Sequence, residues 1–195
     1  MQLAHAAIAA TDAVRSGTAR ARFAQPDPAI NVVTAPGMDE LEKQAAAKHK
    51  RSQFDGWDMI SGRVQPKLGG GPQYLDIVGV NYYAHNQWVS VDAIESTDPR
   101  YRPLHEILGE IHARYSRPLF IAETGIEDQR RVEWLNYICD EPIMAIEQGV
   151  PVEGVCFIPL WIIPAGRTTV VAVLGCGVTL MARVIVRFTR HWRGN

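Results

Sequence analysis

Two short apolar segments, residues 75–83 (LDIVGVNYY) and 118–125 (PLFIAETG), place the strongest constraint on the fold. Both have the length and aliphatic content of buried β-strands, and both end in polar residues. Between them, residues 103–115 (PLHEILGEIHARY) carry apolar side chains at spacings of three and four, which is typical of an amphipathic helix. Strands separated by helices favour a parallel sheet, so the sequence predicts an α/β fold.

Two further strands complete the predicted sheet. Residues 20–25 (RARFAQ) form the first, closed by Pro26 and Pro28, and residues 152–160 (VEGVCFIPL) form the last. Pro142 lies inside the helical stretch before the last strand, and it predicts a kink or a division there. Helices are expected at 2–15, about 38–63, 103–115 and 130–148, and the buried side of the last helix is expected to comprise Val132, Leu135, Ile138, Ile143 and Ile146.

Composition excludes several classes of protein. With 195 residues and 47% hydrophobic side chains, the chain can bury the core of one domain. A net charge of −1 gives no reason to expect a nucleic-acid partner. The three cysteines are widely spaced and include no CxxC pair, which fits a reducing compartment and argues against a disulfide framework or a metal site. The first residues lack the cationic start of a secretory signal, so we expect a cytoplasmic protein.

Glu123 is the main candidate for catalysis. It stands at the carboxyl end of the predicted strand and just before Gly125, the position where (β/α)8 barrels carry catalytic residues. A structural carboxylate that caps the next helix or pairs with an arginine would explain the same residue. On the neighbouring strand, Asn81 and Tyr83 are two residues apart and share one face, whereas Tyr82 points to the other.

The NYY and ETG strand ends resemble the sixth and seventh strands of glycoside hydrolase family 1 β-glucosidases. In that family, a glutamate in an E-N-G context is the nucleophile; here Thr124 replaces the Asn. The resemblance spans about residues 1–160 and implies a partial (β/α)8 TIM barrel, strands five to eight with their helices. It also implies that Glu123 is the nucleophile of a retaining β-glycosidase and that Tyr83 hydrogen-bonds to it.

A retaining glycosidase needs a second carboxyl about 5 Å from the nucleophile. The resembling family carries this acid/base residue in an N-E-P motif at the end of strand four. The sequence contains no Asn-Glu pair, so the resemblance places that residue upstream of Met1. We therefore expect a β-glycosidase fragment with little or no activity alone and no cofactor. A non-catalytic carbohydrate-binding protein, or a pseudogene product, is the alternative.

Residues that contact a carbohydrate are expected beside Glu123. Asn81 is one candidate, and an HNQW run after its strand offers amide, imidazole and aromatic groups that suit a sugar. A loop that merely folds over the barrel explains that run equally well. Asp27 is a further candidate, although turn formation is the commoner reason for a Pro-Asp-Pro sequence. The HNQW run comprises His85, Asn86, Gln87 and Trp88.

Two other features carry no predicted function. His105 and His112 are seven residues apart on one helix face, and we expect both to be solvated. The glycine-rich segment 68–72 (LGGGP) lacks the Lys-Ser/Thr pair of a phosphate-binding P-loop, and it is expected to be a flexible connector.

The C-terminal tail differs from the rest of the chain. After Glu153, 42 residues contain no Asp, Glu or Lys, while five arginines remain. A membrane anchor at 155–186 is one interpretation, but the longest uncharged run, 168–182, has 15 residues where a spanning helix needs about 20.

A frameshift explains the tail better. Reading the codons one base upstream allows 161–195 to regain acids, turn residues and tryptophans, and the resulting peptide resembles the region after strand eight in the same family. We therefore expect a domain at 1–160 and a poorly ordered, out-of-frame tail at 161–195. The unpaired barrel edges, at 20–25 and 152–160, are expected to drive self-association.

Overall fold

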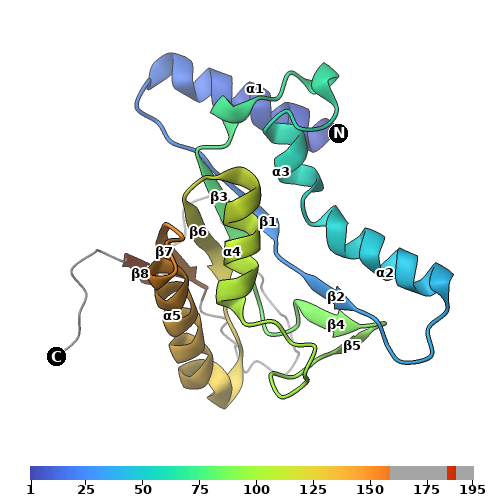
Figure 1. Cartoon of the computed structure of the whole chain (residues 1–195). Coiled ribbons are helices and arrows are strands. Elements are labelled where there is room, and N and C mark those ends of the chain that lie inside the picture. The colour runs from blue at the N-terminus through green and yellow to red at the C-terminus, as the bar shows by residue number, and fades with distance from the viewer. Residues whose placement is uncertain (159–183, 188–195) are drawn as a thin grey trace, which may run out of the picture.

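A computed structural model describes residues 1–158 and 184–187 of the chain. Five strands form the main sheet in the order β1-β3-β6-β7-β8 (Figure 1). The first four run parallel to their neighbours, as predicted, and β8 runs antiparallel to β7. These strands are β1 (Ala24–Pro28), β3 (Ile77–Asn81), β6 (Leu119–Thr124), β7 (Val152–Phe157) and β8 (Val184–Arg187).

A second, smaller sheet, which the sequence did not predict, lies beside the carboxyl ends of β1 and β3 (Figure 1). Its middle strand pairs parallel with β2 and antiparallel with β5. The chain passes directly from β1 to β2 and returns after β3, so this sheet is an extension of the strand ends. Its strands are β2 (Asn31–Val33), β4 (Gln87–Val89) and β5 (Asp92–Ala93).

The first strand was predicted at 20–25, but β1 begins later and includes both prolines. This is possible because β1 is an edge strand, where a missing donor is tolerated. The backbone N–H of Ala29 donates to the carbonyl of Asn81 on β3 at 3.1 Å, so this N–H points toward β3. Alternate residues point their N–H groups to opposite sides, so Pro26 and Pro28 fall on the side that faces away from β3. The open edge therefore lacks two donors, which makes it a poor template for pairing with another chain.

The last strand was predicted at 152–160, and the structure corrects this in two ways. β7 ends at Phe157, and β8 pairs with it over Gly154–Phe157, so β7 is not an edge. The predicted second open edge is therefore wrong for β7. Residues 159–160, most of the predicted 155–186 anchor, and all of the predicted out-of-frame tail except 184–187 lie outside the described residues. Within the described part of the chain, no helix combines the length and apolar character needed to cross a bilayer.

The helices form where the sequence predicted them, with one division. The stretch 38–63 splits at Gln53 and Phe54 into α2 and α3. Asp39 caps the N-terminus of α2 with a reciprocal capping box. The Asp39 side chain accepts from the backbone N–H of Glu42, and the Glu42 side chain accepts from the backbone N–H of Asp39. The helices are α1 (Gln2–Gly17), α2 (Glu40–Ser52), α3 (Asp55–Ile60), α4 (Leu104–Tyr115) and α5 (Arg131–Glu147), with 3-10 turns at Pro66–Leu68, Pro72–Tyr74 and Asp128–Arg130.

α5 runs unbroken through Pro142, so the predicted division is wrong. The predicted buried side is also wrong in part, because Val132 and Leu135 are exposed. The face against the sheet is instead formed by Trp134, Ile138 and Ala145 with Pro142 itself, at helical spacings of four, four and three. A buried, packed proline ring offsets part of the cost of the lost backbone hydrogen bond.

The core lies between the parallel sheet and the pair α4 and α5, which cover one face of it (Figure 1). β3 and β6 on one side, and α4 and α5 on the other, supply its fully buried aliphatic side chains, and α3 adds Trp57, which is 0% exposed. Gly79 lets β1 approach closely, because a Cβ there would lie 2.9 Å from the Cα of Pro26. This packing fixes the carboxyl ends of β3 and β6 side by side.

Candidate active site

The carboxyl ends of β3 and β6 bring Asn81 and Glu123 together. The two strands pair in register as far as Val80 and Ile121, and the register then shifts so that Asn81 pairs with Glu123. Ala122 is the extra residue of this bulge. A bulge changes which face the following side chains point to. Here it places Glu123 on the same face of the sheet as Asn81, and Thr124 on the opposite face.

Both carboxylate oxygens of Glu123 accept hydrogen bonds. The Tyr83 hydroxyl donates to Oε1 at 2.7 Å, and Nδ2 of Asn81 donates to Oε2 at 2.8 Å. Burial and the bond to Glu123 raise the pKa of Tyr83, so its hydroxyl stays neutral and keeps donating. The predicted contact between Tyr83 and Glu123 is therefore present in the structure.

Thr124 stands where the resembling family has Asn, and its side chain turns toward the helices. Its hydroxyl accepts a hydrogen bond from the Trp134 indole at 3.0 Å, and the residue is fully buried. The Trp134 ring stacks on Tyr82, whose side chain lies on the same face, opposite Glu123. Thr124 therefore fastens β6 to α5 and leaves Glu123 as the polar group on the other face.

His85 is the one member of the HNQW run that the structure brings to this cluster. Its ring stacks nearly parallel on the ring of Tyr83, with centroids 5.7 Å apart. His85 is exposed while Tyr83 is half-buried, so the imidazole forms the outer layer over the phenol. A group in this position can contact a ligand that approaches Glu123 from solvent.

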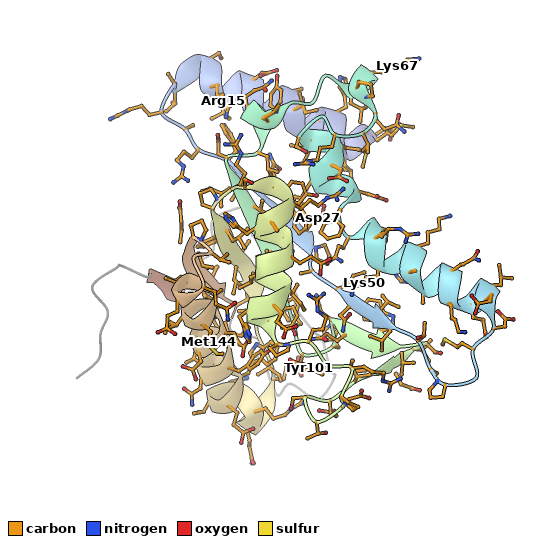
Figure 2. The ribbon with its side chains drawn as sticks, viewed as in Figure 1. Arg15, Asp27, Lys50, Lys67, Tyr101 and Met144 are labelled. Atoms are coloured by element: carbon orange, nitrogen blue, oxygen red, sulfur yellow. The ribbon has the colours of Figure 1, made fainter. Side chains whose placement is uncertain are left out.

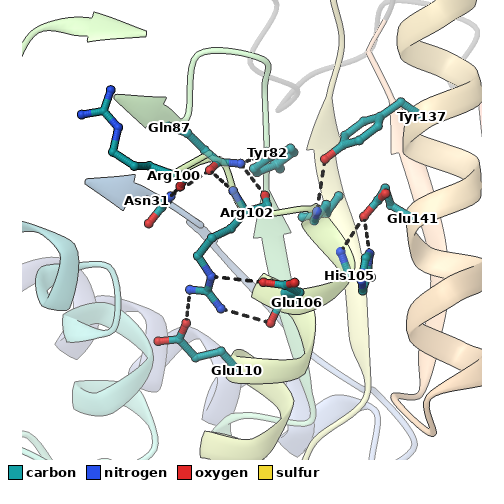
Figure 3. A network of polar contacts seen from close by, with 11 residues as sticks. Asn31, Tyr82, Gln87, Arg100, Arg102, His105, Glu106, Glu110, Tyr137 and Glu141 are labelled. Atoms are coloured by element: carbon teal, nitrogen blue, oxygen red, sulfur yellow. Dashed lines mark hydrogen bonds and ion pairs between the residues drawn. The ribbon is translucent and has the colours of Figure 1, made fainter. Parts of the chain in front are cut away.

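Asn86 and Gln87 lie elsewhere, contrary to prediction. Nδ2 of Asn86 donates to backbone carbonyls of Ala29 and Asn81. Gln87, which is fully buried, donates to Tyr82 and to a carbonyl of the 100–102 segment, and it accepts from that segment's backbone (Figure 3). The polar groups of both side chains form hydrogen bonds that connect β2, β4 and the loop before α4, so neither side chain is available to a sugar.

The remaining predicted contacts also point away from Glu123. The ring of Trp88 meets His49 of α2 edge-on, with centroids 5.5 Å apart. Asp27 pairs with Val80 in register, so it faces the helix layer with that core residue. Its carboxylate lies against Gly56 of α3. Figure 2 labels Asp27. We therefore remove Asp27 from the predicted cleft.

Asp27 has an unusual environment of its own. Burial, reinforced by the negative charge of Asp55, raises the pKa of Asp27 to about 6. Among the described residues, none donates a hydrogen bond to its carboxylate. Without donors, a half-buried carboxylate holds a proton more tightly than it does in water.

Two features of the site escaped the sequence analysis. Cys156 of β7 is buried and lies near enough to Tyr83 to raise the pKa of that phenol. Cys156 is near the carboxyl end of β7 as observed, but it is the middle residue of the predicted strand 152–160, so the sequence carried no signal for it. The second feature is Oδ1 of Asn81, which is buried and accepts no hydrogen bond from the described residues.

Solvent-facing histidines were also expected at 105 and 112, and both are engaged instead. Oε2 of Glu141 on α5 accepts from the backbone N–H of His105 at 2.8 Å and contacts its ring Nδ1 at 2.7 Å (Figure 3). His112 Nδ1 contacts the carbonyl of Arg117. Within the described ranges, no group of three or more His, Cys, Asp or Glu side chains is arranged to hold a metal ion.

Solved structures resemble this fold. The β-glycosidase from the hyperthermophile Thermosphaera aggregans matches with a TM-score of 0.58 and 20% identity over 77% of this chain and 37% of its own. Fpglu1 from Fervidobacterium pennivoraus matches with a TM-score of 0.52 and 18% identity, over 77% of this chain and 37% of its own. A hyperthermophilic β-glucosidase mutant matches with a TM-score of 0.50 and 18% identity, over 77% of this chain and 36% of its own.

These likenesses show the fold alone, because identity is low and the chain spans little more than a third of each of these three structures. No protein-family model matches the chain, and no curated protein does. The chain has an α/β fold that corresponds to part of a (β/α)8 barrel of the β-glucosidase type.

Proposed function

We propose that the site is that of a retaining β-glycosidase, with Glu123 as the nucleophile. The observation that carries this proposal is that both oxygens of Glu123 accept hydrogen bonds, from Tyr83 and Asn81, at the carboxyl end of a parallel strand. Strand ends of this kind carry the chemistry in (β/α)8 barrels. The likeness to β-glycosidase structures supports the same reaction class.

The chemistry follows from the geometry of the carboxylate. An oxygen of Glu123 attacks the anomeric carbon and forms a glycosyl ester, while the bond to the leaving oxygen breaks and that oxygen takes up a proton. Tyr83 and Asn81 hold the carboxylate in position without adding charge.

A second carboxyl is needed to protonate the leaving group and later to activate water. Among the described residues, no second carboxylate shares a hydrogen bond with Glu123, Tyr83 or Asn81. We therefore propose that this chain alone is glycosylated by an activated substrate but does not release the sugar. The same observation favours the second candidate, a protein that binds carbohydrate without hydrolysis.

An aryl glycoside with a dinitrophenolate leaving group tests this proposal. Dinitrophenolate needs no proton to depart, so a stoichiometric burst is expected, followed by no turnover. Azide is an anion that attacks without a base, and adding it should restore turnover and yield a glycosyl azide. A binding protein without chemistry would show affinity for the glycoside but neither burst nor azide product.

We also propose that residues 161–195 are translated out of frame. The absence of Asp, Glu and Lys after Glu153 supports this, because solvated protein surfaces normally mix both signs of charge. Sequencing the coding DNA decides the matter. A one-base difference near codon 160 would support the proposal, and an intact reading frame confirmed in the messenger RNA would contradict it.

A further inference from the structure

A cavity of about 400 Å³ opens at the opposite end of the sheet from Glu123. Its lining includes Leu75 and Arg117, which lie two residues before the starts of β3 and β6. Arg117 and Glu123 are six residues apart along this extended segment, so at about 3.3 Å per residue about 20 Å separates the cavity from Glu123. The other polar groups of its lining are Ser61, Arg63, Tyr115 and Ser116.

The two arginines of the cavity are oriented by backbone carbonyls. Nη2 of Arg63 donates to the carbonyl of Arg114 at 2.6 Å, and Nη2 of Arg117 donates to the carbonyl of Pro72 at 2.9 Å. A carbonyl fixes a guanidinium but does not neutralise it. Within the described part of the chain, neither guanidinium forms an ion pair, so both keep an uncompensated positive charge and free N–H groups.

The nearby acid is already engaged by other residues. Asp58, which is 5% exposed, accepts two hydrogen bonds from the Arg114 guanidinium, at 3.1 and 2.5 Å. It accepts a third from the Tyr115 hydroxyl at 2.8 Å. Asp58 therefore balances Arg114, and the charge of the two cavity arginines remains.

The walls of the cavity are held in place. Segment 68–72, which the sequence predicted to be a flexible connector, packs closely: a Cβ on Gly62 would lie 2.6 Å from the carbonyl oxygen of Gly70. The N–H of Gly71 donates to the Ile60 carbonyl at 2.9 Å. The Arg63 guanidinium also lies over the Tyr115 ring, 5.3 Å from its centroid. The arginines are thus positioned before any ligand arrives.

We propose that this cavity binds a phosphate group. The planar guanidinium presents paired N–H donors that match two phosphate oxygens, and two such groups can share one dianion. The Ser116 hydroxyl adds a donor on the same lining, whereas the Ser61 hydroxyl already donates to the Asp58 carbonyl at 3.5 Å. The ligand is either free phosphate or the phosphate of a phosphomonoester, since both present the same oxygens. The site is separate from Glu123 and does not depend on the glycosidase proposal.

Calorimetric titration of the full chain with inorganic phosphate, and separately with phenyl phosphate, tests the proposal at constant ionic strength. Saturable binding is expected, and Arg63→Gln and Arg117→Gln should each weaken it about tenfold or more. Tighter binding of phenyl phosphate would identify a monoester as the ligand; equal or weaker binding would identify free phosphate. Arg20→Gln, which removes an exposed charge elsewhere, is the matched control and should bind as the unmodified chain does.

Arg117→Lys keeps the charge and removes the paired donors, so it should also weaken binding while preserving the melting temperature. This variant keeps the test decisive if a glutamine variant fails to fold. Failure of both phosphates to bind saturably would overturn the proposal. An equal loss of affinity in Arg20→Gln, or undiminished affinity in the folded Arg63 and Arg117 variants, would also overturn it.

Discussion

Glu123 and Asp27 are half-buried carboxylates at nearly the same level of one sheet, and they face opposite ways. Glu123 receives two neutral donors, from Tyr83 and Asn81. Asp27 receives none among the described residues, and burial beside Asp55 raises its pKa to about 6. Burial alone thus does not prepare a carboxylate for attack. What separates the two is the set of donors that the adjoining strand supplies to Glu123 and withholds from Asp27.

Exchanging each carboxylate for an amide is the strongest way to break this comparison. Glu123→Gln should lower the rate of the dinitrophenolate burst by roughly a thousandfold or more, because the attacking group is lost. Asp27→Asn should leave the burst rate unchanged, since its side chain lies on the helix face. Stopped-flow absorbance measures both. A burst that depends on Asp27 instead would reverse the assignment.

The donors of Glu123 come next in size of effect. Tyr83→Phe removes a hydrogen bond to a charged group, worth about 1.5–3 kcal/mol, and should slow the burst about ten- to a hundredfold. Tyr82→Phe is the matched control, because that hydroxyl lies on the opposite face and bonds to Gln87. The control should melt at a lower temperature yet keep its burst rate. Equal slowing in both variants would mean that the fold, and not the donor, is being measured.

The pH dependence of stability probes the Asp27 side. Its pKa is raised in the folded state, so the folded chain binds the proton more tightly than the unfolded chain. The protonated Asp27 therefore contributes to the free energy of unfolding below about pH 4, and this contribution is lost as the pH rises to about 6. Asp27→Asn should therefore gain stability relative to the unmodified chain between pH 4 and 7, by about 1–2 kcal/mol after allowance for solvent screening. Urea denaturation at several pH values measures the gain; a constant difference would contradict it.

Thr124→Val gives the smallest expected effect and sharpens the contrast between the two faces. It removes the acceptor of the Trp134 indole, which should cost about 1 kcal/mol of stability. Glu123 is the preceding residue but lies on the other face, so the dinitrophenolate burst should be unchanged. Tryptophan fluorescence during urea denaturation reports the first result, and the burst rate reports the second. A large loss of burst rate would show that Thr124 positions Glu123.

The sequence predicted best where a short-range rule decides the outcome. Alternation along a strand puts Asn81 and Tyr83 on one face. Their contact with Glu123 did not follow from spacing: the family resemblance implied it for Tyr83, and in the structure it depends on the bulge at Ala122. The predicted sugar contacts of Asn86 and Gln87 were wrong because these side chains donate to backbone carbonyls of other segments, such as that of Ala29. No local sequence pattern reveals which polar side chains will form hydrogen bonds with backbone groups that are far away in the sequence.

Other failures had a tertiary cause as well. The hydrophobicity of Val132 and Leu135 suggested a buried face, yet contact with the sheet selects Trp134 and Ile138 of the same helix. Pro28 was interpreted as closing a strand, but its missing donor faces an open edge and costs nothing there. Whether a residue lies at an edge or in the middle of a sheet becomes known only once the strand order is known.

Covalent labelling tests the central claim, that Glu123 is a nucleophile held ready by Tyr83 and Asn81. A 2-deoxy-2-fluoro glycoside with a dinitrophenyl leaving group forms a slowly hydrolysed glycosyl ester. Mass spectrometry of the digested, labelled chain then locates the sugar. The account predicts one modified peptide, bearing the sugar on Glu123, and no labelling in Glu123→Gln. Modification of another carboxylate such as Glu127, or undiminished labelling in Glu123→Gln, would contradict it.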